Sequence, residues 1–459
     1  MTGRVTERPT VGPPVAWAFP EPTTVALPNG MRLVLVDLPG QHVLSLRVSL
    51  PLPVSHEEPG TEGSTLLMAR ALDEGTAQHS GEQLAELAER NGIAWGAGAG
   101  ERGVHLGLEV TGRHLGTALA LVAECLASAT FPEAEVARLR RHRLVDLAHE
   151  KADPGSTAAR AFQSVYYDPR DRPHLPVGGT TTTVASLTSE HLRARHAQLT
   201  ARGATVVLTG DLSGVPAAVS TVAATLGAWR GSDEVVGAPG PARRSPQAAR
   251  TVLVPRPGLA QTEVYLGRPG PDRRTPRGWG TYQVLAMLLG GAPHARLDRV
   301  LREERGYTYG VRLGFRPRAV GGTTVVAGSV RADVTVEALA EAVRILDVPG
   351  ADITQQEVRA SADFVTMTAP GRYATADAVA DELVSLAGDG LALDTVTRTL
   401  AQVRGLDRDA VGAAWDEVRA SPPWTVVLVG DPDHTADVER LGLGPVEIVT
   451  TEDEGTGAA

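Results

Sequence analysis

The chain has 459 residues and a formal net charge of −10, and charged residues make up 21% of it. This length is too great for one ordinary core and predicts more than one domain, while acidic charge spread along the chain argues against nucleic acid or an anionic membrane as a partner. With 42% hydrophobic residues the composition is that of a folded globular protein, and no apolar run approaches the ~20 residues of a membrane span.

Cysteine usage and the start of the chain bear on location. Cys125 is the only cysteine, which excludes a disulfide framework and any cysteine-based zinc or iron–sulfur site and fits a reducing compartment. The segment Met1–Pro22 is polar and proline-rich, without the apolar run of a secretory signal. We therefore expect a cytoplasmic protein. Lys151 is the only lysine among 44 basic residues, which we interpret as the habit of a GC-rich bacterial genome.

From residue 23 onward, the first half alternates strand patterns with amphipathic helix patterns. Pro132 marks the start of one helix and Asp153-Pro154 its end. The expected elements, in chain order, are strands Arg32–Val36 and Val43–Leu50, helices Ser64–Leu72 and Gly81–Arg90, strands Gly92–Ala99 and Val104–Thr111, helices Leu115–Ala127, Pro132–Ala152, Ser156–Val165 and Ser189–Leu199, and a strand Thr205–Leu208.

The second half repeats the first. The run TVVLTGD at Thr205–Asp211 returns as TVVLVGD at Thr425–Asp431, a shift of 220 residues. The same shift carries Met31–Val36 onto a run that begins at Thr251, and Leu44–Leu50 onto Val264–Gly270. Three matches in one register predict two copies of one domain.

This repeat sets the expected domain organisation. The two copies are predicted to span residues 23–230 and 251–449, joined by a Gly- and Pro-rich linker over 231–250, with loose tails over 1–22 and 450–459. Helices are too many for a sandwich and the early strands look hairpin-linked. We therefore predict an α+β fold in which each domain is a mostly antiparallel sheet with helices on one face.

Motif searches exclude several kinds of site. The chain has no H-E-x-x-H, H-x-x-E-H, G-x-S-x-G or phosphate-binding loop sequence. His142 and His149 share a helix face, but Arg141 and Arg143 crowd that helix, so a solvated face is the better interpretation. The glycines of Gly96–Gly100 are interpreted as a strand or turn. His56-Glu57-Glu58 is most simply a polar loop.

Several segments carry a resemblance to a known family. They are Leu27–Val36, Glu58–Gly63, Leu66–Leu72 and Glu74-Gly75-Thr76 in the first half, and Leu289–Gly291, Arg296-Leu297 and Leu301–Tyr309 in the second. On these residues the chain resembles the insulinase/pitrilysin class of metallopeptidases, the inverted zincins, and in particular its mitochondrial-processing-peptidase-like branch. The resemblance covers roughly residues 25 to 445. It implies two homologous α+β domains that form half of a clamshell.

The chain departs from this family at the zinc motif. Active members carry H-x-x-E-H on the helix after the second strand, where two histidines bind Zn²⁺ and the glutamate takes a proton from water. Aligned on Gly63 and Glu74, the first ligand position here is Leu66, the general-base position is Ala69 and the second ligand position is Arg70. Leucine has no lone pair, alanine is no base, and arginine is a permanent cation.

The family's remaining ligand is a glutamate on a later helix, which would lie within Pro132–Ala152. By register it would fall at Asp146 or Leu147, with Glu150 nearby, and none of them clearly matches. The resemblance therefore implies that this chain binds no catalytic zinc.

The signature of the second half looks intact. In this class, an arginine and a tyrosine from the second half hold the substrate backbone and steady the tetrahedral oxyanion, and the matching residues here are Arg302 and Tyr309. A guanidinium and a phenol are donors suited to a carbonyl oxygen that gains negative charge. The alternative is that Arg302 caps a helix and Tyr309 packs at a strand start. Arg305 and Tyr307 are nearby candidates if the register differs.

Together these features predict a subunit that is not an enzyme on its own. We expect a non-catalytic partner in a heterodimeric zinc metalloendopeptidase acting on peptides, paired with a homologous chain that carries the zinc and the intact motif. In isolation it could form a homodimer instead. The alternative is a catalytically inert scaffold or peptide-binding member of the same family. A self-sufficient peptidase would need metal ligands that the sequence does not show.

Overall fold

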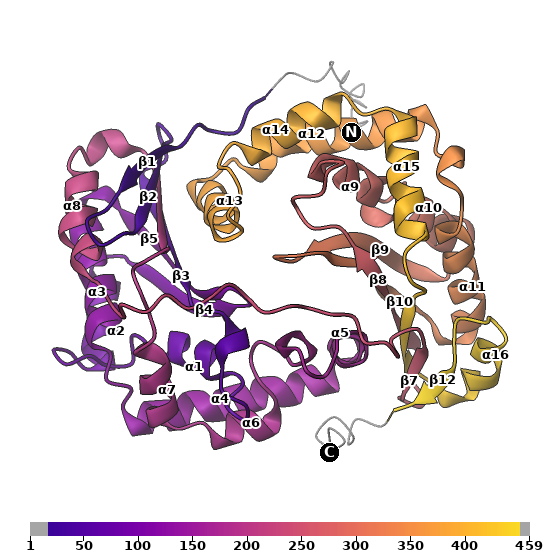
Figure 1. Ribbon diagram of the computed structural model, residues 1–459, viewed down its shortest axis with the longest axis horizontal. Coiled ribbons are helices and arrows are strands. Elements are labelled where there is room, and N and C mark those ends of the chain that lie inside the picture. The colour runs from indigo at the N-terminus through magenta and orange to yellow at the C-terminus, as the bar shows by residue number, and fades with distance from the viewer. Residues whose placement is uncertain (1–16, 450–459) are drawn as a thin grey trace, which may run out of the picture.

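A computed structural model describes residues 17–449 of the chain. Figure 1 shows two halves side by side, the first in indigo to magenta and the second in orange to yellow, each built on a six-stranded sheet. The expected tail over 450–459 and residues 1–16 of the expected N-terminal tail lie outside the described residues.

The last part of the expected N-terminal tail is not loose. Phe19 is only 5% exposed. Its ring meets the ring of Tyr373 at 4.9 Å in an edge-on contact, and Trp17 stacks on the same tyrosine at 5.9 Å. Aromatic side chains bury enough surface to fasten a short segment, so residues 17–19 of the expected tail are packed against the second half.

The first half contains the elements that its sequence pattern predicts, together with three short ones that it does not. The additions are β1, α6 and α8, and the expected helix at Ser189–Leu199 ends at His196. The elements are β1 Thr23–Ala26, β2 Arg32–Asp37, β3 Val43–Pro51, α1 Ser64–Arg70, α2 Gly81–Arg90, β4 Ala94–Gly100, β5 Gly103–Thr111, α3 Leu115–Ser128, α4 Glu133–Ala152, α5 Pro154–Tyr166, α6 Thr181–Ser186, α7 Ser189–His196, β6 Thr205–Gly210 and α8 Ala218–Ala224.

The second half follows a similar order after the segment 231–250, except that β12, which takes the place of β1 in the sheet, comes last. Two of its segments, η6 and η7, are π-helical, a rare conformation often found near functional sites. The elements are β7 Thr251–Pro255, β8 Gln261–Gly270, α9 Trp279–Ala286, η6 Met287–Gly291, α10 Arg296–Asp298, η7 Arg299–Glu304, β9 Thr308–Pro317, β10 Gly322–Arg331, α11 Thr335–Leu346, α12 Gln355–Arg372, α13 Ala376–Gly388, α14 Thr395–Arg404, α15 Arg408–Arg419, β11 Thr425–Gly430, α16 Thr435–Glu439 and β12 Val446–Ile448.

The two sheets have corresponding strand orders, β1-β2-β6-β3-β5-β4 and β12-β7-β11-β8-β10-β9. The repeated sequence TVV forms β6 in one sheet and β11 in the other, and every residue of both strands is buried. Most neighbouring strands are antiparallel, while β6 lies parallel to β2, and β11 and β12 lie parallel to β7. The predicted α+β fold with a mostly antiparallel sheet in each half is confirmed.

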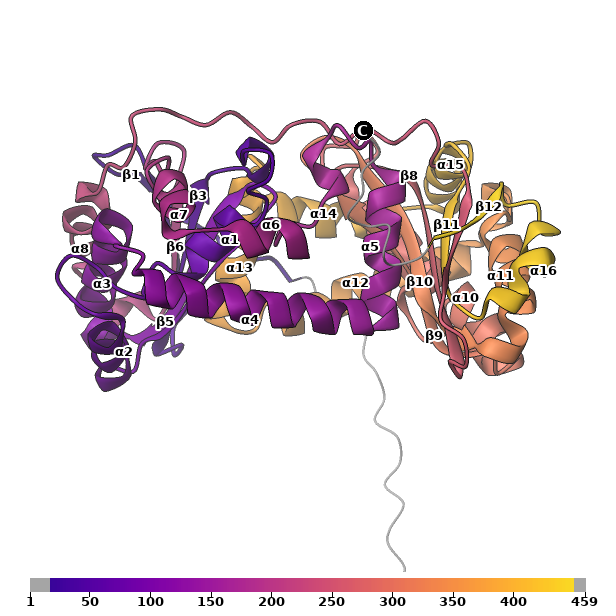
Figure 2. The same cartoon turned by 90° about the horizontal axis from the view of Figure 1, so that it is seen from below.

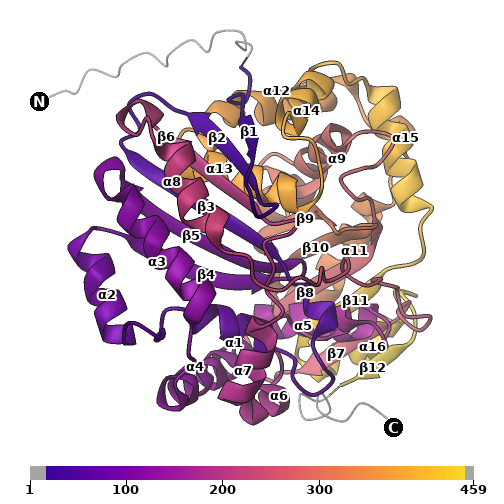
Figure 3. The same ribbon diagram turned by 60° about the vertical axis from the view of Figure 1, so that its left-hand side comes forward.

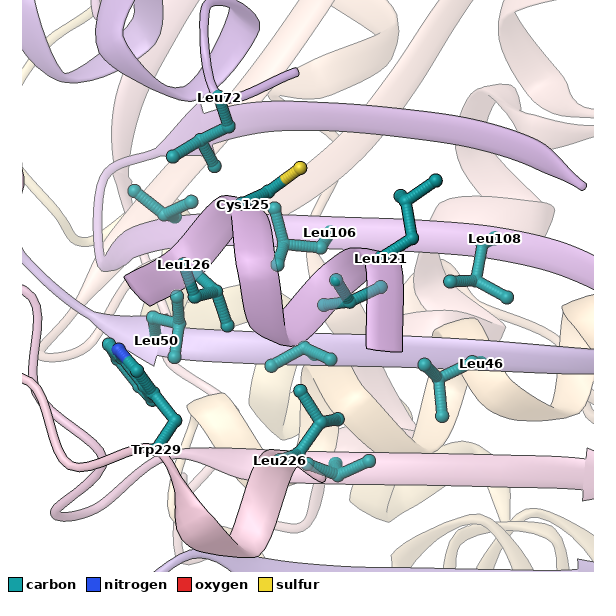
Figure 4. Packing of buried hydrophobic residues seen from close by; sticks show 14 of the residues in the cluster. Leu46, Leu50, Leu72, Leu106, Leu108, Leu121, Cys125, Leu126, Leu226 and Trp229 are labelled. Carbon is teal, nitrogen blue, oxygen red and sulfur yellow. The ribbon is translucent and has the colours of Figure 1, made fainter. Parts of the chain in front are cut away.

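One face of each sheet is covered by helices of its own half. Figure 3 shows α3 and α8 in front of the first sheet, and Figure 4 shows the side chains between α3 and the strands. Leu121, Cys125 and Leu126 of α3 lie among Leu106 of β5 and Leu50 of β3, all nearly inaccessible to water. Burial raises the pKa of the Cys125 thiol to about 12, so the only cysteine stays protonated and packs as a small apolar side chain.

The other face of each sheet is covered by a helix from the opposite half. Figure 1 shows α5 and α13 between the two sheets. Helix α5 follows α4 in the first half, yet Ala158, Phe162 and Val165 pack against β7, β8 and β11 of the second sheet. These apolar residues lie three or four apart, so they form one helix face. The ring of Phe162 rests on Gly267, where a Cβ would collide with it.

Helix α13 makes the reciprocal contact. It belongs to the second half, and Val379, Leu383 and Leu386 pack against β2 and β6 of the first sheet. Asp381 on its exposed side accepts a hydrogen bond from Arg47 of β3 at 2.5 Å. The prediction of helices on one face thus describes each half alone, whereas in the whole chain both faces are covered.

Further contacts fasten the halves together. Figure 2 shows the expected linker, 231–250, as an extended strap from one half to the other, and Arg243 in it pairs with Asp171 at 2.6 Å. At the hairpin tips Arg318, between β9 and β10, forms an ion pair with Glu101, between β4 and β5. Burial lowers the pKa of Arg318 to about 10. The two halves therefore meet through packed and charged contacts rather than through a free tether.

Helices α4 and α12 are the longest of those described, with 20 and 18 residues, and they occupy corresponding places in the two halves. Both carry charged residues along their length. Over residues 17–449, no helix combines the length and the apolar character that crossing a membrane requires.

Candidate functional site

The three zinc-motif positions lie on helix α1. The helix begins after Gly63, whose φ of 97° suits glycine, and ends at Arg70. Leu66 and Arg70 are four residues apart and therefore share one face. Leu66 is half-buried and Ala69 is fully buried, while the Arg70 side chain is 42% exposed. The face that would carry two metal ligands instead carries an alkyl group and a cation.

Arg70 faces helix α4. Its Nη1 lies 3.4 Å from Oδ2 of Asp146, whose side chain is 49% exposed. Of the three positions considered for the remaining ligand, only Asp146 makes this contact. Leu147 is 1% exposed and packs inward, and Glu150 pairs with the buried Arg143 at 2.6 Å. Because of how α4 is oriented about its axis, Asp146 is the carboxylate that faces α1.

These residues do not fit a zinc ion. The set holds one carboxylate and a guanidinium, whereas a catalytic zinc needs three donor side chains. Over residues 17–449, no group of three or more His, Cys, Asp or Glu side chains is placed to hold a metal. His142 and His149 of α4 are exposed, as expected for a solvated helix face.

A buried ion pair that the sequence did not reveal positions α1. The Glu57 carboxylate accepts hydrogen bonds from the Thr65 backbone N–H at 2.9 Å and from Arg172 Nη2 at 2.7 Å. The Glu57 side chain is 0% exposed and that of Arg172 is 9% exposed. Nearby, Arg195 Nε donates to the Thr65 hydroxyl at 2.9 Å. His56–Glu58 does lie in a loop, but Glu57 in it is buried and binds the backbone N–H of Thr65 in the first turn of α1.

Arg302 and Tyr309 flank a sharp reversal of the chain in the second half. Arg302 lies in η7, and its backbone carbonyl accepts the N–H of Gly306 at 3.1 Å. Gly306 adopts a φ of 65°, the left-handed conformation that commonly ends a helix. The chain then enters β9, which holds Tyr309. The Arg302 side chain is 42% exposed and pairs only loosely with its neighbour Glu303, at 3.4 Å.

Tyr309 projects from a β-bulge. In the β9–β10 ladder Gly310 opposes Ser329 and Thr308 opposes Val330, so Tyr309 is the extra residue. A bulge re-aims a side chain away from the regular alternation of a strand. Tyr309 is 87% exposed, the highest value among the large hydrophobic side chains described. By contrast, Tyr307 packs partly against the hydrophobic core of the second half. Of the two tyrosines, Tyr309 is therefore the one whose side chain is accessible to another molecule.

The structure keeps the two sets of candidate residues apart. Helix α1 contacts β4, β5, α4 and α7, all in the first half. Segment η7 contacts β9, α10 and α11, all in the second half. Leu66, Ala69 and Arg70 therefore lie in one half of the chain, and the exposed pair Arg302 and Tyr309 lies in the other.

Known proteins of similar sequence match part of the chain. Residues 186–363, less than half of the chain, match the family described as "Peptidase M16 inactive domain". Two curated relatives, from Rickettsia bellii and Rickettsia felis, are each described as an uncharacterized zinc protease. They are 23% and 24% identical over 166 residues, which is 36% of this chain and 40% of each relative. The match thus spans well under half the length of these relatives.

Solved structures share the fold. A peptidase M16 inactive domain from Pseudomonas fluorescens superposes with a TM-score of 0.79 at 23% identity, covering 90% of this chain and 98% of that one. A protease from Helicobacter pylori gives 0.81 at 17% identity (89% and 99% covered), and a chain of complex III2 from Candida albicans gives 0.77 at 14% (92% and 99%). These similarities show that the chain shares the fold of these proteins, and residues 186–363 are similar to the M16 inactive domain.

Proposed function

We propose that this chain is the non-catalytic subunit of a two-chain zinc metalloendopeptidase of the processing-peptidase-like branch. A homologous partner would carry the H-x-x-E-H motif and the zinc, and this chain would supply Arg302 and Tyr309 to the shared site. The observation that carries the proposal is the contrast between the two halves: a cation faces Asp146 where a metal would bind, while Tyr309 stands 87% exposed.

The chemistry of the pair suits peptide hydrolysis. When water attacks a peptide carbonyl, its oxygen becomes negatively charged, and donors aimed at that oxygen lower the barrier. The Arg302 guanidinium carries a permanent charge, and the Tyr309 phenol donates one hydrogen bond. Neither side chain is buried in this chain, so both can reach an oxyanion held by a partner.

The sheet edges indicate where an extended peptide would bind. Strand β4 is the outermost strand of the first sheet and pairs with β5 alone, which leaves an edge for backbone hydrogen bonds. The corresponding edge strand of the second sheet, β9, is covered. The Val311 N–H donates to Asp298 at 3.1 Å, and Gly290 lies so close to Leu313 that a Cβ would collide with it. The proposed substrate is an extended peptide, for which β4 is the open sheet edge of this chain, and the proposed setting is the cytoplasm.

A second function is an inert scaffold or peptide-binding protein of the same family. The likeness to a chain of complex III2, an assembly, favours it, as does the Arg70–Asp146 contact that fills the altered motif. An inert scaffold or peptide-binding protein would not need the side chains of Arg302 and Tyr309. Their substitution therefore separates the two proposals.

The test mixes this chain with a homologous chain from the same genome that carries H-x-x-E-H, and measures peptide hydrolysis and bound zinc. Activity should appear on mixing and be absent from this chain alone. Arg302→Ala and Tyr309→Phe should each lower turnover by roughly 10²–10³-fold, the cost of losing one oxyanion donor, with zinc content unchanged. Arg299→Ala, which removes an exposed cation from the same segment, is the control. Unchanged turnover in both variants would overturn the proposed role.

A further inference from the structure

Regular strand alternation would place the Tyr309 side chain inside the second half. Successive side chains of a strand point to opposite faces, so residues 309, 311 and 313 of β9 would share one face. Val311 and Leu313 are 2% and 3% exposed and belong to the hydrophobic core of the second half. Tyr309 is nevertheless 87% exposed. Its outward position therefore depends on the bulge, which shifts the alternation by one residue.

Thr308 takes the inward position instead. It lies opposite Val330 in the β9–β10 ladder, and the two residues are 8% and 2% exposed. The Thr308 hydroxyl accepts the backbone N–H of Gly310 at 2.9 Å and donates to the backbone carbonyl of Ser329 at 2.5 Å. Gly310 and Ser329 are the opposed pair next to the bulge. One hydroxyl therefore bridges the two strands at the point where their regular pairing is interrupted.

We infer that Thr308 is a positioning residue for Tyr309, because its hydroxyl maintains the bulge that directs the phenol outward. Backbone N–H and C=O groups inside a sheet need partners, and a hydroxyl can donate and accept at the same time. A side chain without a hydroxyl would leave both groups without this partner. Regular pairing, with Tyr309 on the core-facing side, would then compete with the bulge. The role of Thr308 in turnover rests on the proposed function, whereas its effect on the direction of Tyr309 does not.

Neighbouring contacts confine the effect to the bulge. Two residues after Tyr309, the Val311 N–H donates to the carboxylate of Asp298, which is 0% exposed. This contact fixes the outer edge of β9. On the inner edge, a Cβ at Gly328 of β10 would lie only 2.5 Å from the Gly310 carbonyl oxygen, so the two strands approach closely there. Losing the hydroxyl should therefore alter the direction of Tyr309 rather than the whole strand.

The first measurement uses this chain alone and follows nitration of its tyrosines by tetranitromethane, with each site quantified by mass spectrometry. Tyr309 should react faster than the half-buried Tyr307. Thr308→Val, which replaces the hydroxyl by a methyl group, should slow nitration of Tyr309 severalfold, and Thr308→Ser, which keeps the hydroxyl, should not. Thr324→Val is the matched control. Thr324 is a 0% exposed residue of β10 whose hydroxyl donates to the Pro269 carbonyl at 3.3 Å, away from the bulge.

The second measurement is turnover after mixing with the homologous chain that carries H-x-x-E-H. Thr308→Val should lower kcat by up to roughly 100-fold with little change in KM, since misplacing a group by ~1 Å can cost about that much. Thr308→Ser should retain the turnover of the unaltered chain. In a Tyr309→Phe background, Thr308→Val should cost little more, because the phenol hydroxyl that it positions is already absent.

Three results would overturn the inference. One is an unchanged nitration rate of Tyr309 in a Thr308→Val chain that is folded by circular dichroism. Another is an equal effect of Thr308→Val and Thr308→Ser, since the hydroxyl would then not be the cause. The third is a set of independent losses of turnover from Thr308→Val and Tyr309→Phe.

Other outcomes separate this inference from the proposed function. Slower nitration of Tyr309 with unchanged turnover would support the role of Thr308 in directing Tyr309 and would count against the proposed function. If Thr308→Val does not fold, Thr308→Ala removes the same hydroxyl with a smaller side chain, and its nitration and turnover are interpreted in the same way.

Discussion

The packing of α5 on the second sheet predicts a large, specific loss of stability when Phe162 is truncated. Its side chain is 4% exposed. The ring lies 4.9 Å from that of Tyr166 and 4.7 Å from that of Tyr265, and it rests on Gly267. Gly267 has no side chain that could move into the space left by an alanine. We therefore expect Phe162→Ala to cost about 4 kcal/mol of unfolding free energy, within the ~3–5 kcal/mol typical of buried phenylalanines.

A double-mutant cycle tests the cause of this loss. Gly267→Ala alone should destabilise the chain, because its Cβ and the Phe162 ring cannot both fit. In the Phe162→Ala background that space is empty, so the same substitution should cost at least about 1 kcal/mol less. Phe364→Ala is the matched control, since Phe364 is 39% exposed and should lose under about 1 kcal/mol.

The assay is equilibrium urea unfolding followed by tryptophan fluorescence and circular dichroism. A loss below about 1 kcal/mol for Phe162→Ala, or additivity of the two substitutions within ~0.5 kcal/mol, would refute the reasoning. Either result would mean that α5 is not an integral part of the cluster that it forms with β7, β8 and β11.

Two further predictions concern buried and titrating carboxylates. Glu57→Gln should lower the free energy of unfolding in urea by about 3 kcal/mol, because it leaves Arg172 buried without its charged partner. A loss under ~1 kcal/mol would mean that water reaches the Arg172 guanidinium. Burial alone would raise the pKa of Glu357, but hydrogen bonds from Arg296 and Thr354 outweigh it and hold the pKa at about 2, below the ordinary 4.5. Its stabilisation is therefore complete above pH 4.5 and is lost as the pH falls towards 2. Unfolding midpoints across this range should fall more steeply in the unaltered chain than in Glu357→Gln, and equal slopes would contradict the assignment.

Local signals predicted most elements of the fold. Helix α2 spans Gly81–Arg90 as expected, because Ser80 and Gln83 form a capping box at its start. The elements that were missed carry weaker local signals. Strand β1 is four residues long and is defined by pairing with β2. Helix α6 is rich in threonine, a poor helix former, and the hydroxyl of Thr183 in its capping box also donates to the backbone carbonyl of Glu62 in a distant loop.

The candidate site also has features that the sequence predicts and features that only the fold shows. That Leu66, Ala69 and Arg70 offer neither ligand nor base follows from the chemistry of those side chains. The choice of Asp146 over Leu147 required the rotation of α4 about its axis, which depends on what α4 packs against. The exposure of Tyr309 required the bulge in β9, a feature of strand pairing that no local pattern marks.

The sequence by itself determined that the chain holds two copies of an α+β unit and that Leu66, Ala69 and Arg70 offer neither metal ligand nor base, because repeats, helix periodicity and side-chain donors are local properties. Only the tertiary structure decided which sheet each helix covers. The apolar face of α5 would suit either sheet, since hydrophobic burial has no direction. Likewise, only the fold shows that the loop residue Glu57 binds Arg172, which is 115 positions away in the sequence.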